Sequence, residues 1–248
     1  MKAIDLNCDL GEGMGRDGEM MPLITSANIA CGAHAGDEAT MRESVELALR
    51  HGVAIGAHPG FPDREHFGRR ELAATPEQIG QWVSEQTHAL MKIAQAAGAR
   101  VSHVKPHGAL YNLAARDAAT AEAIAAAVKA CDARLVLVGL SGSELPAAGR
   151  RAGLRAAHEV FADRAYHRDG TLVARTDARA LIDDSTAAVE RMIGLLHTCK
   201  IRSVEGEEIA LRADTICVHG DGVHAVDLAR GLRGALAAAR IATKSLTV

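Results

Sequence analysis

Short aliphatic segments alternate with longer amphipathic segments along this chain, and this alternation is the feature that most constrains its fold. Buried strands are predicted at residues 3–6, 27–31, 53–57, 101–104, 135–138, 154–157 and 215–218. Helical patterns occur between them at 37–51, 75–97, 118–130, 143–152, 183–200 and 222–240. Because a helix that crosses between successive strands leaves those strands parallel, the chain is predicted to be an α/β protein with a parallel sheet.

The chain is expected to form one domain over residues 1–248. Its 248 residues fit a single α/β barrel, which can reach about 250 residues, and no linker, low-complexity tract or repeat divides it. Thr75, Pro76 and Gln78 form a capping-box pattern that predicts a helix start. The interval 161–214 carries a helix and a predicted hairpin around Glu205-Gly206-Glu207, so we interpret it as an elaboration of the barrel.

Composition excludes several kinds of partner. The formal net charge is −3, which gives no basic field for nucleic acid, so small molecules or proteins are expected instead. The five cysteines form no CxxC pair, which argues against a disulfide framework or a zinc ribbon and favours a reducing cytoplasm. No apolar run approaches the ~20 residues of a membrane helix, and no membrane association is expected.

Polar residues recur at the carboxyl ends of the predicted strands. Alternate residues of a strand share a face, so each strand has one inward-facing column. The columns that end in polar residues are Asp5, Asn7, Asp9; Asn28, Ala30, Gly32, His34; Ala54, Gly56, His58; His103, Lys105, His107; and Thr215, Cys217, His219, Asp221. Strand ends and crossover loops converge at the mouth of an α/β barrel, so a charged, histidine-rich site is predicted there.

Two kinds of sequence motif bear on cofactors. The segment Gly139-Leu-Ser-Gly-Ser143 lacks the second glycine of a nucleophile elbow, so Ser143 is interpreted as a helix cap. No phosphate loop or dinucleotide fingerprint is present, so ATP would have to bind differently or on another chain. Asp9, His34 and His58 could hold a divalent metal or could be hydrogen-bonded site residues, and the sequence leaves the metal unassigned.

Six ordered blocks resemble the LamB/YcsF family over essentially the whole chain. The blocks are DLNCDLGE (5–12), SANIACGAHAGD (26–37), GAHPGFPD with FGRR (56–63 and 67–70), VKPHGALYN (104–112), EVFADR (159–164) and VHGD (218–221). The resemblance implies an irregular seven-stranded β/α barrel, TIM-barrel-like and similar to the glycoside hydrolase and deacetylase folds. It also implies ATP-dependent opening of 5-oxoproline to L-glutamate together with two further subunits. These B and C subunits would bind ATP or share in binding it.

Residue roles follow as a hypothesis from these matched positions. Lys105 with one of Arg69, Arg70 or Arg164 would hold the substrate carboxylate or a phosphoryl group. Asp9, His34 or His107 would accept a proton from water, with Glu12 or Asp37 orienting the imidazole. The other expected substrate contacts are Asn7, His58, Phe61, Tyr111, Glu159 and His219. Lys105 is also expected to be essential for activity while adding little to folding stability.

Two other functions are compatible with the same residues. One is a metal-dependent amide or carbohydrate deacetylase that uses Asp9, His34 and His58. The other is a non-catalytic subunit that only presents 5-oxoproline to its partners. Several carboxylates and imidazoles in one column argue against the second, because binding a carboxylate requires cations.

Overall fold

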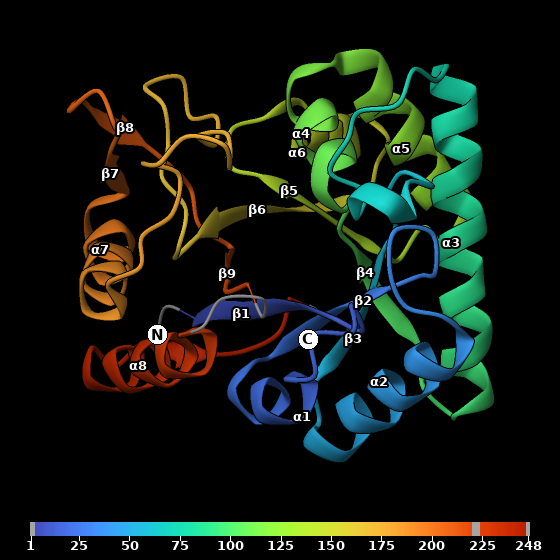
Figure 1. The fold of residues 1–248 in the computed structure, drawn as a ribbon, viewed down its shortest axis with the longest axis horizontal. Helices are drawn as coiled ribbons and strands as arrows, with labels where there is room; N and C mark the ends of the chain where they lie inside the picture. Colours follow the sequence, from blue (N-terminus) through green and yellow to red (C-terminus); the bar gives the residue numbers. More distant parts are fainter. Residues whose placement is uncertain (1–2, 220–223, 247–248) are drawn as a thin grey trace.

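A closed parallel β-barrel surrounded by helices is the core of this protein (Figure 1). The computed structural model describes residues 3–219 and 224–246. Seven strands make the barrel in the order β1-β2-β3-β4-β5-β6-β9, and β1 closes it by pairing with β9. They are β1 Ala3–Leu10, β2 Ser26–Ala30, β3 Ala54–His58, β4 Val101–Val104, β5 Val136–Leu140, β6 Arg155–Phe161 and β9 Thr215–Cys217. The prediction of a seven-stranded parallel β/α barrel is confirmed.

The helices lie outside this barrel, where their apolar faces cover the strands. They are α1 Asp17–Met20, α2 Glu38–His51, α3 Pro76–Ala96, α4 Gly108–Arg116, α5 Ala118–Cys131, α6 Glu144–Arg151, α7 Ser185–Thr198 and α8 Ala225–Ala238, with short 3-10 turns η1 Met21–Leu23 and η2 Arg64–His66. The predicted start of the last helix at Gly222 lies outside the described residues. Sequence patterns missed α4, because its preceding residue, His107, makes no capping hydrogen bond through its side chain.

Local sequence signals fix several helix starts. At α3 the capping box is complete, since the Thr75 hydroxyl accepts from the backbone N–H of Gln78 while the Gln78 side chain accepts from the backbone N–H of Thr75. Asp37 caps α2 by accepting from the Thr40 backbone N–H. Ser143 occupies the N-cap position of α6 as predicted, but its hydroxyl makes no capping hydrogen bond.

The connection between β6 and β9 is the irregular part of the barrel. It contains α7 and the antiparallel hairpin of β7 Lys200–Arg202 and β8 Glu208–Ala210, seen at the left of Figure 1. Gly206, with φ +91°, lies in the hairpin loop, where glycine adopts the left-handed conformation without strain. The predicted helix and hairpin are therefore confirmed. A short strand, β10 Ala242–Thr243, pairs with the start of β1.

Apolar packing occurs mainly on the outer faces of the strands. In β1, Ile4, Leu6 and Leu10 face the surrounding helices and are at most 2% exposed. Burying each such side chain stabilises the fold by about 1.5–3 kcal/mol.

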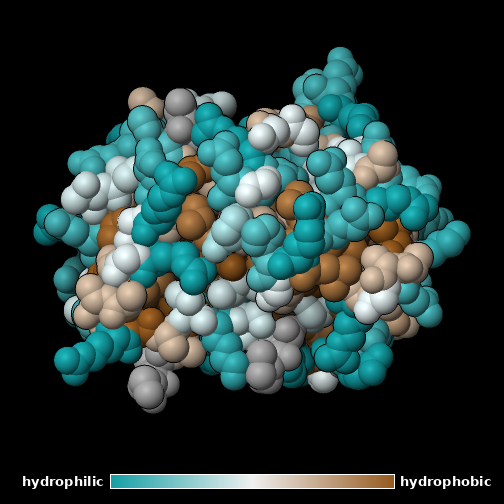
Figure 2. Space-filling view, turned by 90° about the horizontal axis from the view of Figure 1, so that it is seen from below, coloured by the Kyte–Doolittle hydropathy of each residue, from teal (hydrophilic) through white to brown (hydrophobic). Residues whose placement is uncertain are grey.

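Hydrophilic residues cover much of the face shown in Figure 2, which looks at the molecule from below the view of Figure 1. None of the helices in the described ranges is long and apolar enough to cross a membrane.

Polar side chains fill the barrel interior instead. Asp5 accepts hydrogen bonds from the hydroxyls of Ser26 at 2.6 Å and Thr215 at 2.5 Å. The ring of His103 crosses the interior directly beside Gly56, where an added Cβ would lie 2.0 Å from the ring Nε2. The hydrogen-bonded side chains of the interior thus hold the residues at the strand ends in position.

Candidate active site

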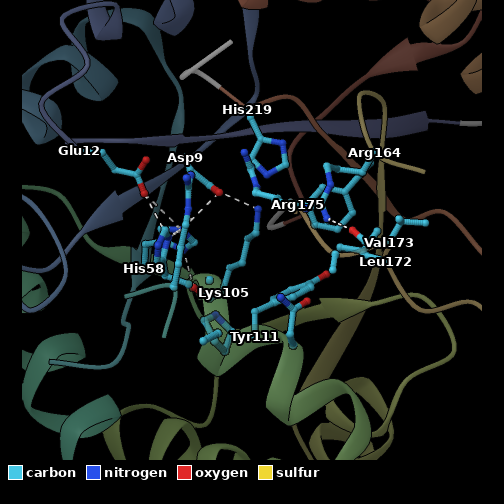
Figure 3. Close-up of a pocket in the computed structure, with 18 of the residues that line it drawn as sticks. Asp9, Glu12, His58, Lys105, Tyr111, Arg164, Leu172, Val173, Arg175 and His219 are labelled. Atoms are coloured by element: carbon cyan, nitrogen blue, oxygen red, sulfur yellow. Dashed lines mark hydrogen bonds and ion pairs between the residues drawn. The ribbon is translucent and has the colours of Figure 1, made fainter. Parts of the chain in front are cut away.

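A cavity of about 420 Å³ opens where the carboxyl ends of the barrel strands meet (Figure 3). Residues of the predicted mouth line it together with residues from the connection after β6. The lining side chains that carry charge or can titrate are Asp9, Glu12, His58, Arg69, Lys105, His107, Tyr111, Arg164, Arg175 and His219. This is the position at which ligands bind in α/β barrels.

Lys105 stands in the middle of the cavity floor, where Figure 3 shows its side chain next to Asp9. Its Nζ lies 2.9 Å from Asp9 Oδ1 and 2.9 Å from Glu159 Oε1, and it also donates to Cys217 Sγ at 3.1 Å. Burial alone would lower the pKa of Lys105, but Asp9, Cys217 and Glu159 raise it well above its usual value. The lysine is therefore a buried ammonium whose charge is balanced within the protein.

Asparagines link this ion pair to the barrel interior. Asn7 donates to Glu159 Oε1 at 2.9 Å and to Thr215 Oγ1 at 2.6 Å. Asn28 donates to Asp9 Oδ1 at 2.8 Å. Asn7 and Glu159, both predicted substrate contacts, thus lie beneath the cavity and hold Lys105 and Asp9 in place rather than line it.

A group of three imidazoles and one carboxylate lies at one end of the cavity. Glu12 Oε1 is 3.2 Å from His107 Nδ1, 3.4 Å from His34 Nε2 and 3.8 Å from His58 Nε2. His34 stacks on His107 with their ring centroids 3.8 Å apart. The glycines at 60 and 68 permit this packing, because a Cβ at either position would come within 2.8 Å of His34.

Burial and charge set the protonation states of this group. Burial lowers the pKa of His34 to about 4 and also lowers that of His107, so both rings are neutral at pH 7. Burial opposes the charged form of His58 too, but the Asp9 carboxylate raises its pKa. Burial would raise the pKa of Glu12, yet His107 and His34 bring it below its usual value. Burial also opposes ionisation of Asp9, but the positive charges of His58 and Lys105 lower its pKa well below the usual value, so Asp9 is ionised.

Arginines lie on the opposite side of the cavity, where Figure 3 shows Arg164 and Arg175 across from Glu12 and His58. Arg164 is 5% exposed and donates to the carbonyl oxygen of Val173 at 2.6 Å. Its pKa is lowered by burial and by the positive charge of Arg175, with Arg69 adding to the effect. Cations held against one another in this way favour binding of an anion.

The remaining wall is aromatic. His219 lies over the Phe161 ring with centroids 5.4 Å apart, and its Nδ1 is 2.7 Å from Asp163 Oδ2. The Tyr111 ring contacts Phe161 edge-on. Burial, with the nearby Glu159 carboxylate, raises the pKa of Tyr111 well above its usual value, so it stays a neutral phenol. A small flat ring would fit against these faces.

Three predicted site residues lie away from this cavity. Asp37 is exposed and its carboxylate caps α2, so it orients no imidazole. Phe61 is fully buried against Trp82 and packs in the core rather than beside a substrate. Arg70 is exposed and its guanidinium lies 3.5 Å from Asp63. These residues were expected in the site because they follow the strand ends in the sequence. The backbone at their positions directs their side chains away from the cavity.

Sequence reasoning missed other residues that the structure brings to the cavity. Arg175 comes from the loop between β6 and α7, and Phe161 supplies the aromatic face that had been expected from Phe61. Asp163 positions His219. The EVFADR block contained two of these residues, whereas nothing in the irregular segment around Arg175 distinguished it from other loop arginines. Asp221, in the predicted column of the last barrel strand, lies outside the described residues.

Two groups among the described residues have metal-ligand chemistry. One is Glu12, His34, His58 and His107, and the other is Asp9, Cys217 and His219. The predicted set of Asp9, His34 and His58 is therefore divided between them. Asp9 remains close to the first group, with its Oδ2 3.3 Å from His58 Nε2.

These features define a class of protein: a parallel β/α barrel with a small acid–imidazole and arginine site at its mouth. The LamB/YcsF family profile matches residues 4–248, and the chain belongs to that family. A 5-oxoprolinase A subunit from Geobacillus kaustophilus is 55% identical over 240 residues, which are 95% of this chain and 94% of that relative. The 5-oxoprolinase A subunit of Bacillus licheniformis is 50% identical over 100% of both chains.

A solved structure shows the same fold. The lactam utilization protein of Thermus thermophilus superposes with a TM-score of 0.91 and 45% identity, covering 99% of this chain and 100% of that one. The barrel and the connection after β6 are therefore features shared with a protein whose name refers to lactams.

Proposed function

We propose that this chain is the A subunit of a 5-oxoprolinase, which opens the lactam of 5-oxoproline to L-glutamate in a complex that hydrolyses ATP. Relatives that are 50–55% identical over nearly full length carry the name of the 5-oxoprolinase A subunit. The observation that carries the proposal is the division of the cavity into an arginine side and an acid–imidazole side. Such a division matches a small ring with a carboxylate at one end and an amide carbonyl at the other.

The arginine side would bind the substrate carboxylate. Arg164 and Arg175 line the cavity, and a guanidinium can hold a carboxylate through two parallel hydrogen bonds. The arginines take the role first expected of Lys105, because the Lys105 ammonium is already bound to Asp9 and Glu159. The lactam carbonyl would then face Asp9, with the ring beside the aromatic wall.

ATP is required because an unstrained five-membered lactam is a poor electrophile. Transfer of the γ-phosphoryl group to the lactam oxygen releases ADP and a proton and activates the ring carbon. Water then adds to that carbon and the C–N bond breaks, with a proton going to nitrogen, which leaves an acyl phosphate. A second water hydrolyses the acyl phosphate to glutamate and phosphate. The B and C subunits would bind ATP or share in binding it, since this sequence has no phosphate-loop motif.

Asp9 is the proposed proton acceptor for the attacking water. Of the three predicted candidates, Asp9 and His107 line the cavity and His34 does not. His107 has both ring nitrogens occupied by neighbours, since Nε2 lies 2.9 Å from the Phe67 carbonyl oxygen and Nδ1 faces Glu12 and His58. Asp9 is ionised and has a carboxylate oxygen, Oδ2, next to the imidazole group.

The test uses the chain reconstituted with the B and C subunits, and measures ATP-dependent glutamate release from 5-oxoproline. Asp9→Asn should lower kcat/KM by at least ~100-fold, the scale of losing a general base. Asp37→Asn is the matched control, because Asp37 is an exposed helix cap and asparagine caps equally well. Normal turnover by an assembled Asp9→Asn complex would contradict the proposal and favour a subunit that only presents the substrate.

A further inference from the structure

Four donor atoms from four segments converge on one point beside the cavity. They belong to Glu12 after β1, His34 after β2, His58 at the end of β3 and His107 before α4. All four lie within 4.8 Å of one another. The set spans a large part of the sequence, so the closed barrel and not local structure brings it together.

The hydrogen bonds of two rings fix which nitrogens point inward with lone pairs. His58 Nδ1 lies 2.7 Å from the Lys105 carbonyl oxygen, and His107 Nε2 lies 2.9 Å from the Phe67 carbonyl oxygen. A carbonyl oxygen only accepts, so these two nitrogens carry the hydrogens. The other nitrogens, His58 Nε2 and His107 Nδ1, face each other at 3.0 Å. In neutral rings both are acceptors, and they repel unless a cation stands between them.

A proton on His58 would relieve that repulsion but would leave the rest of the group unsatisfied. Glu12 Oε1 and both ring nitrogens of His34 are buried without a hydrogen-bond partner. A buried polar atom without a partner costs about 1–3 kcal/mol, so such atoms usually have one. A single metal ion can accept lone pairs from His34, His58 and His107 and from the Glu12 carboxylate at the same time.

We propose that Glu12, His34, His58 and His107 form a divalent transition-metal site, with zinc as the ion that best fits three imidazoles and one carboxylate. Tetrahedral zinc with bonds of about 2.0–2.1 Å requires donor atoms about 3.3 Å apart. Glu12 Oε1 lies 3.2, 3.4 and 3.8 Å from the three nitrogens, and the two facing nitrogens are 3.0 Å apart. Backbone carbonyls hold the outer nitrogens of His58 and His107, which is the usual support of metal-binding histidines.

This site would support the reaction, a role that rests on the proposed function. Asp9 Oδ2 lies 3.3 Å from His58 Nε2, so an ion held by His58 would place positive charge beside the general base. Four protein ligands fill the positions of a tetrahedral ion, so the ion would fix these side chains around Asp9 and would not bind the attacking water. His34 and His107 then serve as ligands, and Asp9 receives the proton.

The test measures metal binding by the full-length chain after removal of metals with a chelator. Zinc and cobalt(II) are titrated in, and bound metal is counted by mass spectrometry while the visible absorption of cobalt reports four-coordinate geometry. Wild-type protein should bind one ion per chain. Glu12→Gln, which preserves side-chain shape, and His107→Asn should weaken binding by at least ~100-fold. His219→Asn is the control, since His219 belongs to the other donor group.

Absence of zinc and cobalt binding by folded wild-type protein would overturn the proposal. Equal loss of binding in His219→Asn would also overturn it, because the ion would then be held by Asp9, Cys217 and His219. The activity assay separates the two proposals. A complex that binds metal as described but releases no glutamate would retain the site and refute the function. A chain that binds neither zinc nor cobalt, in a complex with full turnover, would retain the function and refute the site.

Discussion

Replacement of Lys105 by methionine tests how the centre of the site is held together. The Lys105 ammonium is 2.9 Å from both Asp9 Oδ1 and Glu159 Oε1, and the residue is 2% exposed. Methionine keeps most of the side-chain volume but removes the positive charge. Two buried carboxylates then face each other without a cation, which is the costly arrangement for buried ion pairs.

The expected loss of stability is large. Removing one partner of a buried ion pair costs about 3–5 kcal/mol. For a chain of this size each kcal/mol lowers the melting temperature by about 2–4 °C, so Lys105→Met should melt about 6–20 °C below wild type. The structure thus argues against the sequence-based expectation that Lys105 adds little to folding, because its ammonium, although it lines the cavity, is paired with two carboxylates of the protein.

The assay is thermal unfolding and urea unfolding at neutral pH, each followed by circular dichroism. Lys92→Met is the matched control, because Lys92 is exposed on α3 and its loss should change the free energy of unfolding by less than about 0.5 kcal/mol. In wild type the low pKa of Asp9 stabilises the fold above its unfolded pKa, and this contribution disappears as pH falls. The deficit of Lys105→Met should accordingly shrink at acidic pH. Equal stability of Lys105→Met and Lys92→Met at neutral pH would refute the reasoning.

Four further outcomes are expected. Gly56→Ala should either not fold at all or reach its unfolding midpoint at a markedly lower urea concentration, because its Cβ would lie 2.0 Å from His103 Nε2. A wild-type urea midpoint would contradict this packing. Burial lowers the pKa of His34 to about 4 and that of His103 to about 3. Below pH ~6.5 these two side chains therefore bind protons in the unfolded chain but remain neutral in the folded chain. The stabilisation that these two neutral rings give the metal-free chain should therefore be complete above pH ~6.5 and fall as pH drops toward 4, and urea midpoints independent of pH over this range would exclude the neutral buried rings. The isolated chain should release no glutamate from 5-oxoproline and ATP, and it should unfold in one calorimetric transition; turnover without the B and C subunits, or two separable transitions, would count against these expectations.

The sequence by itself determined the barrel and most of its mouth. Alternation of aliphatic and amphipathic segments depends only on local periodicity, and it located all seven barrel strands. Because successive strand residues alternate in direction, His58, Lys105 and His107 could be placed at the inward ends of their strands before any contact was known. Caps such as Thr75 with Gln78 are likewise local signals.

Only the tertiary structure decided what those side chains meet. Whether Lys105 contacts a substrate or Glu159, 54 positions away in the chain, depends on how the strands close into a barrel. Whether Phe61 faces the cavity or Trp82 depends on one turn of the loop after β3. Arg175 reaches the site from a segment without periodicity, so no local pattern could place it. Which groups a side chain contacts is decided by three-dimensional packing. Several segments set each contact at once, so a pattern along one segment cannot specify it.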